Sequence, residues 1–241
     1  MQYHSLYTKE QNSMTFQVGL VGNDGLVLAS DKLFQDCEGG AKSPRKARKF
    51  ESGSHVTCCY SGDIMAMYAA QLIAALDWTS ISRDTNSIKR SLLDCGKRAY
   101  QQREREIGMI PPYAIRKVIV AAHNSTLWLL HVSEQSAVEP CEDRVIAGDT
   151  QNTARQYVNR FAVNCESRPV LGLVRLAAFA VLMAGYENCE GVEGLDVVMI
   201  RGELPYTFTK EQIQALKDSS EKLCRDIEIS LSMEVVYPTG E

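Results

Sequence analysis

The sequence has little that would direct it to a metal ion, a nucleotide or an anionic partner. Its eight cysteines form no CxxC pair and its four histidines form no HxxxH motif, so the spacings typical of metal ligands are missing. It also has no GxGxxG or P-loop motif to cradle a phosphate. A net charge of −4 gives no bulk attraction to nucleic acid or to an anionic membrane. We therefore expect no metal, no cofactor, no nucleic acid and no membrane partner.

Signals for export or membrane insertion are missing too. The first 14 residues lack a charged region followed by an apolar one, so they do not form a secretory signal. The longest apolar stretch, 171–185, is shorter than a membrane span and contains Arg175, which favours a buried core helix. Cysteines in apolar surroundings, as at 55–62, are typical of reduced, buried thiols. These features predict a cytoplasmic protein.

The composition is that of an ordinary globular protein, with 45% apolar and 23% charged residues over a length of 241. No internal repeat, low-complexity tract or long linker divides the chain. Residues 1–14 are polar and aperiodic, so we expect an N-terminal extension there and one domain over 15–241.

Hydrophobic patterning predicts the order of strands and helices. Strands are expected at 15–21, 26–31, 55–62, 115–122, 126–132, 143–149 and 194–202. Helices are expected at 62–78, 84–107, 150–162, 169–185 and 209–231, and the last opens with a Thr-x-x-Gln capping box. A loop with a basic cluster is expected at 33–50. Hairpins separated by pairs of helices predict an α+β fold, in which helices pack on the outer faces of two stacked, mainly antiparallel sheets.

The most informative residues stand at the start of this domain. Thr15 opens the first strand, Asp31 follows sixteen residues later, Lys46 lies in a basic segment, and Ser61-Gly62-Asp63 ends an apolar strand. Together these features resemble the proteasome β-subunit family of N-terminal-nucleophile hydrolases, and the predicted element order agrees with that family's four-layer αββα sandwich over residues 15–231. The hairpin-first start and the long C-terminal helix are closer to the bacterial ancestral β-like or betaproteobacterial type.

The resemblance implies a threonine-type endopeptidase. A threonine hydroxyl is a weak nucleophile, but the free α-amino group of the same residue can remove its proton near neutral pH. By resemblance, Thr15 is the nucleophile, Lys46 is the lysine that favours its deprotonation and Asp31 holds that lysine. Gly62 is the oxyanion residue, whose backbone N–H would stabilise the developing negative charge. The individual readings of these residues as a strand start, a turn residue and a solvated lysine remain open.

Two further assignments have named alternatives. Lys49 is the rival for the lysine role, and Lys46 is preferred because Arg-Lys-Ala-x-x-Phe matches the family pattern. Tyr60, two residues before Gly62, is expected to floor the pocket for the substrate side chain that precedes the cut. The alternative for Tyr60 is a core side chain whose hydroxyl is bonded to the backbone.

Asp149 and Glu190 are carboxylates at positions where the family usually has hydroxyls. Asp149 replaces the serine of a Gly-Ser-Gly turn, and Glu187 and Glu190 replace the aspartate and serine of a later Asp-x-x-Ser-Gly motif. Negative charge near an α-amine raises its pKa and lowers the fraction of free base. Asp149 has the alternative role of capping the helix that follows.

Thr15 needs a free amino group, so residues 1–14 are either removed as a propeptide or precede a true start at Met14, which we favour. The resemblance further implies a homo-oligomeric double ring with peptide or unfolded protein as substrate, and an AAA+ unfoldase as a possible partner. The alternative function is a catalytically silent structural or assembly subunit of such a ring.

Overall fold

The computed structural model describes residues 15–36, 43–46, 48–62, 64–108, 110, 116–122, 126–148, 153–187, 192–202 and 204–232. The strands are β1 Phe16–Gly22, β2 Gly25–Ser30, β3 Leu33–Asp36, β4 Ser43–Lys46, β5 Phe50–Ser52, β6 Val56–Ser61, β7 Lys117–Ala122, β8 Thr126–His131, β9 Ala137–Cys141, β10 Arg144–Gly148, β11 Asp196–Arg201 and β12 Leu204–Thr207. The helices are α1 Ile64–Ala74, α2 Thr85–Ile107, α3 Thr153–Phe161, α4 Val170–Glu187 and α5 Lys210–Ser232.

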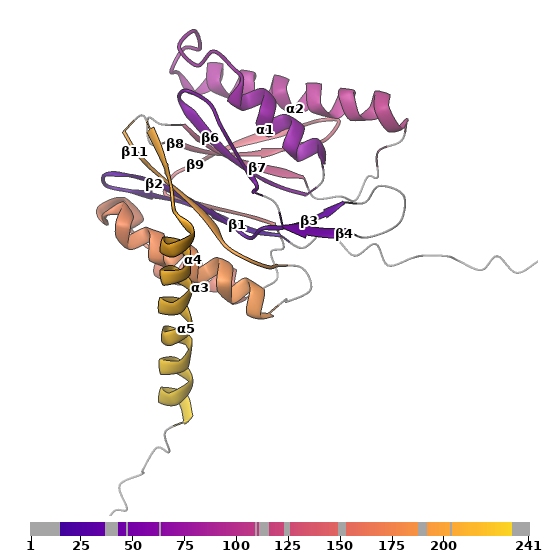
Figure 1. Cartoon of the computed structure of the whole chain (residues 1–241). Helices are drawn as coiled ribbons and strands as arrows, with labels where there is room; N and C mark the ends of the chain where they lie inside the picture. The colour runs from indigo at the N-terminus through magenta and orange to yellow at the C-terminus, as the bar shows by residue number, and fades with distance from the viewer. Residues whose placement is uncertain are drawn as a thin grey trace, which may run out of the picture.

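Two five-stranded antiparallel sheets form the centre of the molecule (Figure 1). The first sheet has the order β10-β1-β2-β11-β12, and the second has the order β5-β6-β7-β8-β9. Strands β3 and β4 pair as a separate hairpin. The hairpin β1–β2 arises because two apolar runs flank Asn23-Asp24, and the turn pairs Gly22 with Gly25.

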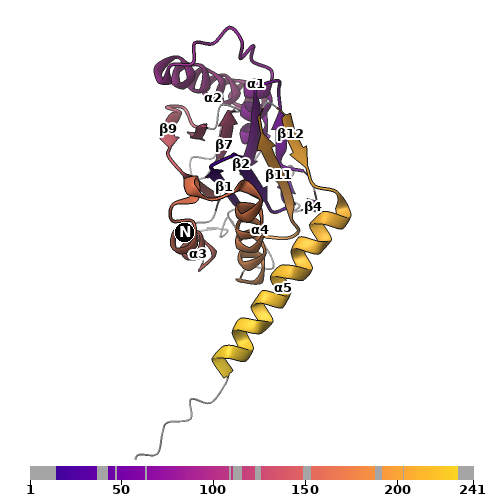
Figure 2. The ribbon, with the colours of Figure 1, turned by 90° about the vertical axis from the view of Figure 1, so that its left-hand side faces the viewer.

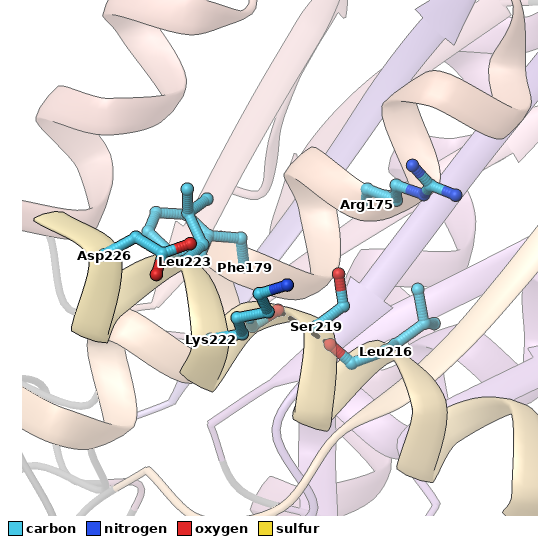
Figure 3. Close-up of a pocket in the computed structure, with 8 residues that line it drawn as sticks. Arg175, Phe179, Leu216, Ser219, Lys222, Leu223 and Asp226 are labelled. Carbon is cyan, nitrogen blue, oxygen red and sulfur yellow. Dashed lines mark hydrogen bonds between the residues drawn. The ribbon is translucent and has the colours of Figure 1, made fainter.

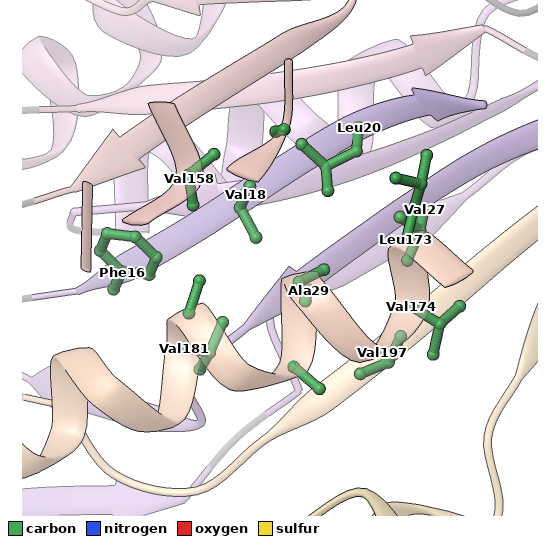
Figure 4. Close-up of a cluster of buried hydrophobic side chains, with 14 of the residues drawn as sticks. Phe16, Val18, Leu20, Val27, Ala29, Val158, Leu173, Val174, Val181 and Val197 are labelled. Atoms are coloured by element: carbon green, nitrogen blue, oxygen red, sulfur yellow. The ribbon is translucent and has the colours of Figure 1, made fainter. Parts of the chain in front are cut away.

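Helices cover the outer face of each sheet. Helices α1 and α2 lie on the second sheet, and α3 and α4 lie on the first (Figure 1). Figure 4 shows the lower core, in which β1 side chains such as Phe16 and Val18 meet Val158 of α3 and Val181 of α4. A third cluster fills the space between the sheets. The predicted α+β sandwich with layers αββα is confirmed.

The N-terminal caps of helices α2 and α5 form as the sequence indicates. The Asp84 carboxylate caps α2 by accepting hydrogen bonds from the backbone N–H groups of Asn86 and Ser87, each at 3.0 Å. The capping box of α5 is formed, since the Thr209 N–H donates to Gln212 Oε1 at 2.8 Å and the Gln212 N–H donates to Thr209 Oγ1 at 3.3 Å.

The apolar helix α4 is a core helix. It is long and apolar enough to cross a membrane by composition alone, with a mean hydropathy of 1.6, but nine of its residues are buried and it packs along β1 and β2. The six cysteines that the structure describes are all free thiols, and four of them are buried.

The segment expected to be a loop at 33–50 contains more structure than its sequence indicates. It holds the β3–β4 hairpin, and β5 begins at its end. Strands β9 and β12 were not predicted either. All these strands are three to five residues long, and β4, β9 and β12 each contain a proline, so neither alternation nor propensity marks them.

We predict that the layer between the sheets contributes strongly to stability. Leu28 of β2 is fully buried there, so Leu28→Ala should lower the free energy of unfolding by about 2–5 kcal/mol. Leu204 is 78% exposed, so Leu204→Ala should change it by less than about 0.5 kcal/mol. Urea denaturation of both variants tests the difference, and equal losses would contradict this account of the core.

Candidate active site

Thr15 lies directly before β1 and only 2% of it is exposed. The next residue, Phe16, pairs with Gly148 of β10. Gly148 has φ +100°, and a Cβ atom there would lie 1.7 Å from the Thr15 carbonyl oxygen. Only glycine fits this position, because it both adopts the left-handed backbone and leaves room for Thr15.

Asp31 follows β2 and is fully buried beside the start of β1. Its Oδ1 accepts a hydrogen bond from the Phe16 N–H at 3.0 Å, and its Oδ2 accepts one from the Leu33 N–H at 3.0 Å. Its own N–H donates to the Phe16 carbonyl at 3.2 Å. The backbone of both strand ends therefore fixes the carboxylate next to Thr15.

Lys49 brings these two residues into one site. Its Nζ lies 2.8 Å from Asp31 Oδ2 and 3.1 Å from Thr15 Oγ1. The lysine is as buried as its partners, with 2% of its surface exposed. A carboxylate, an ammonium and a hydroxyl are thus joined in a row and shielded from water.

The lysine whose ammonium contacts Thr15 is Lys49, the rival residue, so this geometry favours Lys49 over Lys46 for the lysine role, which stays a prediction. Lys46 is the last residue of β4 and pairs with Leu33 in the β3–β4 hairpin. The chain then returns to the second sheet, where the Lys49 carbonyl accepts a hydrogen bond from the Tyr60 N–H at 3.1 Å. The family-like sequence pattern around Lys46 did not account for this hairpin. Because of the hairpin, the lysine that reaches Thr15 comes three residues later in the sequence, at position 49.

Burial dominates the electrostatics of the site. Removal from water raises the pKa of the Asp31 carboxyl above its ordinary value, while the charge of Lys49 and hydrogen bonds from Lys49, Phe16 and Leu33 oppose that rise. Burial also raises the pKa of the neighbouring Cys59 thiol, so that thiol stays protonated. The arrangement can hold an ammonium against a hydroxyl oxygen and favour loss of the hydroxyl proton.

Gly62 follows the end of β6 with φ +108°, a conformation that favours glycine. The preceding Ser61 donates its hydroxyl hydrogen to the Lys117 carbonyl at 3.3 Å, which holds the end of β6 to β7. The role of the Gly62 N–H as an oxyanion donor stays a prediction.

Tyr60 has the contacts of the core alternative. Its ring belongs to the cluster beneath α1 and α2, and its hydroxyl donates to the Arg48 carbonyl at 3.1 Å. Its role as the floor of a substrate pocket stays a prediction. Among the carboxylates, Asp149 and Glu190 lie outside the described residues, and Glu187 is an exposed residue at the end of α4.

Metal sites and surface pockets are the other kinds of functional site to consider in the described part of the chain. Among the described residues, no group of three or more His, Cys, Asp or Glu side chains is arranged to hold a metal ion. Two surface pockets flank α5 where it meets α3 and α4, and neither is lined by Thr15, Asp31 or Lys49. Figure 3 shows the pocket between α4 and α5.

No protein-family model and no curated protein matches the sequence. Solved structures do match. The chain is similar to "Anbu (ancestral beta-subunit)" from Yersinia bercovieri, with a TM-score of 0.68 and 12% identity over 93% of this chain and 100% of that one. It is similar to the Anbu complex of Pseudomonas aeruginosa, described as a helical assembly, with a TM-score of 0.69 and 13% identity over 93% and 98% of the two chains. It is also similar to Anbu from Hyphomicrobium sp. strain MC1, with a TM-score of 0.65 and 10% identity over 92% of this chain and 99% of that one.

At this level of identity the likeness shows the fold. It extends over more than nine-tenths of the chain, so the resemblance drawn from Thr15, Asp31, Lys46 and the Ser61-Gly62-Asp63 turn is confirmed as a resemblance in fold. The site described above rests on the geometry of this chain.

We predict that Lys49→Met destabilises the protein in a pH-dependent way. The change leaves Asp31 buried without its counter-ion, which costs about 3–5 kcal/mol for a buried pair. Loss of the ammonium also raises the pKa of Asp31 further. A carboxyl whose pKa is raised in the folded state stabilises the fold only when protonated, so stability falls as the pH rises through that pKa. The loss relative to wild type should therefore be larger at about pH 8 than at about pH 5.

Urea denaturation at both pH values measures this difference. The matched variant Lys49→Met/Asp31→Asn removes the uncompensated charge and should regain part of the lost stability at the higher pH. A loss that is independent of pH, together with a further loss in the double variant, would contradict the buried ion pair.

Proposed function

We propose that this chain, which has the fold of the Anbu proteins, is a threonine-type peptidase subunit of a proteasome-like assembly and hydrolyses peptide bonds with Thr15 as an N-terminal nucleophile. The observation that carries the proposal is the position of Lys49 Nζ between Thr15 Oγ1 and Asp31 Oδ2. A buried lysine that contacts a threonine hydroxyl serves no obvious purpose in packing, but it is what activation of that hydroxyl requires.

The mechanism begins once residues 1–14 no longer precede Thr15. The free α-amine takes the proton of the Thr15 hydroxyl, and Oγ1 attacks the carbonyl carbon of the scissile peptide. The Gly62 N–H stabilises the resulting oxyanion. As the tetrahedral intermediate collapses, the C–N bond breaks and the leaving amine receives the proton. Water, deprotonated by the same amine, then hydrolyses the ester and restores Thr15.

Lys49 and Asp31 assist the proton transfers in these reaction steps. The ammonium donates a hydrogen bond to Thr15 Oγ1 and so favours the alkoxide-like form. Asp31 supplies the compensating charge and, through its bonds from Phe16 and Leu33, keeps Lys49 in place. The site needs no cofactor for this chemistry.

The second candidate is a catalytically silent subunit of the same kind of assembly. It is favoured by the carboxylates at Asp149 and Glu190, which replace hydroxyls, since added negative charge near the α-amine would keep it protonated. Glu187 replaces an aspartate and so adds no charge relative to the family pattern. Glu187 is exposed, so solvent screens its charge. The two candidates differ in whether Thr15 reacts.

We predict that Thr15→Ala abolishes hydrolysis of fluorogenic peptides and leaves the fold intact. Lys49→Met should lower kcat by about 100-fold or more, whereas Lys46→Met, a matched change three residues away, should lower it by less than about threefold. The assays use protein whose intact mass shows that Thr15 is the first residue. Circular dichroism and the thermal midpoint separate loss of chemistry from loss of fold.

The proposal fails if protein that begins at Thr15 neither hydrolyses peptides nor forms a covalent adduct with a threonine-directed electrophile. That outcome would favour the silent subunit. Full activity of Lys49→Met together with loss of activity in Lys46→Met would return the lysine role to Lys46.

Assembly is the second part of the proposal. We propose a cytoplasmic homo-oligomer whose substrates are peptides or unfolded protein, which an AAA+ unfoldase could deliver. The solved complex from Pseudomonas aeruginosa is a helical assembly. Contacts of one head-to-tail type close into a ring or continue as a helix according to the rotation between neighbours.

The surface around α5 is the best candidate for a contact between copies. Figures 1 and 2 show α5 leaving the body of the protein, and two pockets, one of them drawn in Figure 3, lie along its sides. Large apolar side chains are exposed around it, namely Phe161 at 49%, Tyr186 at 59% and Leu223 at 47%. Exposed apolar surface of this kind is typical of an interface, and a second copy of this chain would cover it.

We predict that Leu223→Arg dissociates the assembly. Analytical ultracentrifugation of the wild type at micromolar concentration should show twelve or more subunits. The variant should sediment as a smaller species, because a charge replaces an exposed apolar side chain that the proposed interface would bury. Gln101→Arg, an exposed change on α2, is the matched control and should leave the distribution unchanged. A wild type that is only monomer or dimer, or a variant that sediments like wild type, would contradict this prediction.

A further inference from the structure

Gln17 is a buried polar residue that sequence patterns did not single out. It is the only polar side chain in the run FQVGLVG of β1, and none of its surface is exposed. Its side-chain Nε2 donates a hydrogen bond to the Tyr60 carbonyl of β6 and lies 3.4 Å from Ser30 Oγ of β2. The amide therefore links the first sheet to the second.

The linked residues belong to the candidate active site. Gln17 is two residues after Thr15 on β1, and Tyr60 is two residues before Gly62. Tyr60 in turn donates its N–H to the Lys49 carbonyl at 3.1 Å and its hydroxyl to the Arg48 carbonyl at 3.1 Å. The Lys49 ammonium returns to Thr15 Oγ1. A closed circuit of contacts thus runs from Thr15 through Gln17, Tyr60 and Lys49 back to Thr15.

The side chain is a poor choice if its task is only to fill space. Gln17 Oε1 is buried and has no hydrogen-bond partner among the described residues. A buried acceptor without a partner costs stability, because its bond to water is lost on folding and not replaced. Methionine has nearly the same shape and would avoid that cost. What methionine lacks is the N–H that reaches Tyr60.

We propose that Gln17 is a positioning residue that fixes the distance between the strand that starts at Thr15 and the strand that leads to Gly62. The inference rests on the proposed function for its catalytic consequence. The hydrogen bond from Gln17 to the Tyr60 carbonyl, called the brace below, can be tested without activity. A displacement of about 1 Å between a nucleophile and its oxyanion donor is enough to reduce a rate strongly. A hydrogen bond at this point resists such a shift better than an apolar contact, because it is directional.

The test uses Gln17→Met in the assembled protein that begins at Thr15, with Val198→Ala as the matched control. Val198 is a fully buried residue of the layer between the sheets, and its apolar side chain supplies no hydrogen bond to the circuit. We expect Gln17→Met to keep the wild-type thermal midpoint or raise it, and to lower kcat by about 10- to 100-fold with KM unchanged. Val198→Ala should lower the thermal midpoint and leave kcat near the wild-type value.

The second measurement is backbone hydrogen exchange in the Thr15→Ala background, where no turnover occurs. Adding Gln17→Met should accelerate exchange at residues 57–62 by about tenfold, and adding Val198→Ala should not do so selectively. If exchange at 57–62 is unchanged, or if kcat is unchanged in an active enzyme, the positioning role is wrong. If exchange rises while the wild type that begins at Thr15 shows neither turnover nor adduct, the brace stands and the proposed function fails.

Discussion

The buried pair of Lys49 and Asp31 is the interaction on which the rest of the site depends. Both side chains are almost completely removed from water, and the attraction between two such charges compensates for lost hydration only when the geometry is good and the remaining polar atoms are bonded. Asp31 meets that condition through N–H groups of Phe16 and Leu33, which lie on either side of it in the fold. The start of β1, the end of β2 and the segment before β5 are thereby held at one point.

The registers of the two sheets bring these three segments together. The β1–β2 register pairs Gln17 with Ser30, so Asp31 necessarily arrives beside Phe16. The β5–β6 register pairs Phe50 with Cys59, so Lys49 arrives beside Tyr60 on the facing sheet. Apolar packing between the sheets then sets their separation, and Lys49 spans that separation to reach Thr15. The hydrogen bonds between strands and the packing of the core thus bring Lys49 and Asp31 together. The fold does not depend on the ion pair to form.

Much of this arrangement was predictable from the sequence, because it follows from strong local patterns. The apolar runs before and after Asn23-Asp24 marked the hairpin that places Thr15 and Asp31, and the long helices were marked by periodicity and capping residues. The choice between Lys46 and Lys49 was not predictable. It depends on the β3–β4 hairpin, whose strands are too short for alternation, and on a register in the other sheet. Gln17 was visible only as an isolated polar residue in an apolar strand, and its contact with Tyr60 exists only in the folded chain.

The electrostatics of Lys49 also explain how a threonine could become its own base. An ammonium has three N–H donors, and described residues use two of them, at Asp31 and at Thr15. An α-amine released at Thr15 belongs to the residue whose hydroxyl already touches this ammonium. Protonating that amine would place a second positive charge beside Lys49 in a buried site, and both like charge and burial lower the pKa of an amine. In the proposed mechanism this would favour the free base of the α-amine, which is the form that can accept the proton of the Thr15 hydroxyl. The contact with Asp31 that offsets the burial of Lys49 also holds its ammonium beside Thr15, so in the proposed mechanism one ion pair would serve both stability and catalysis.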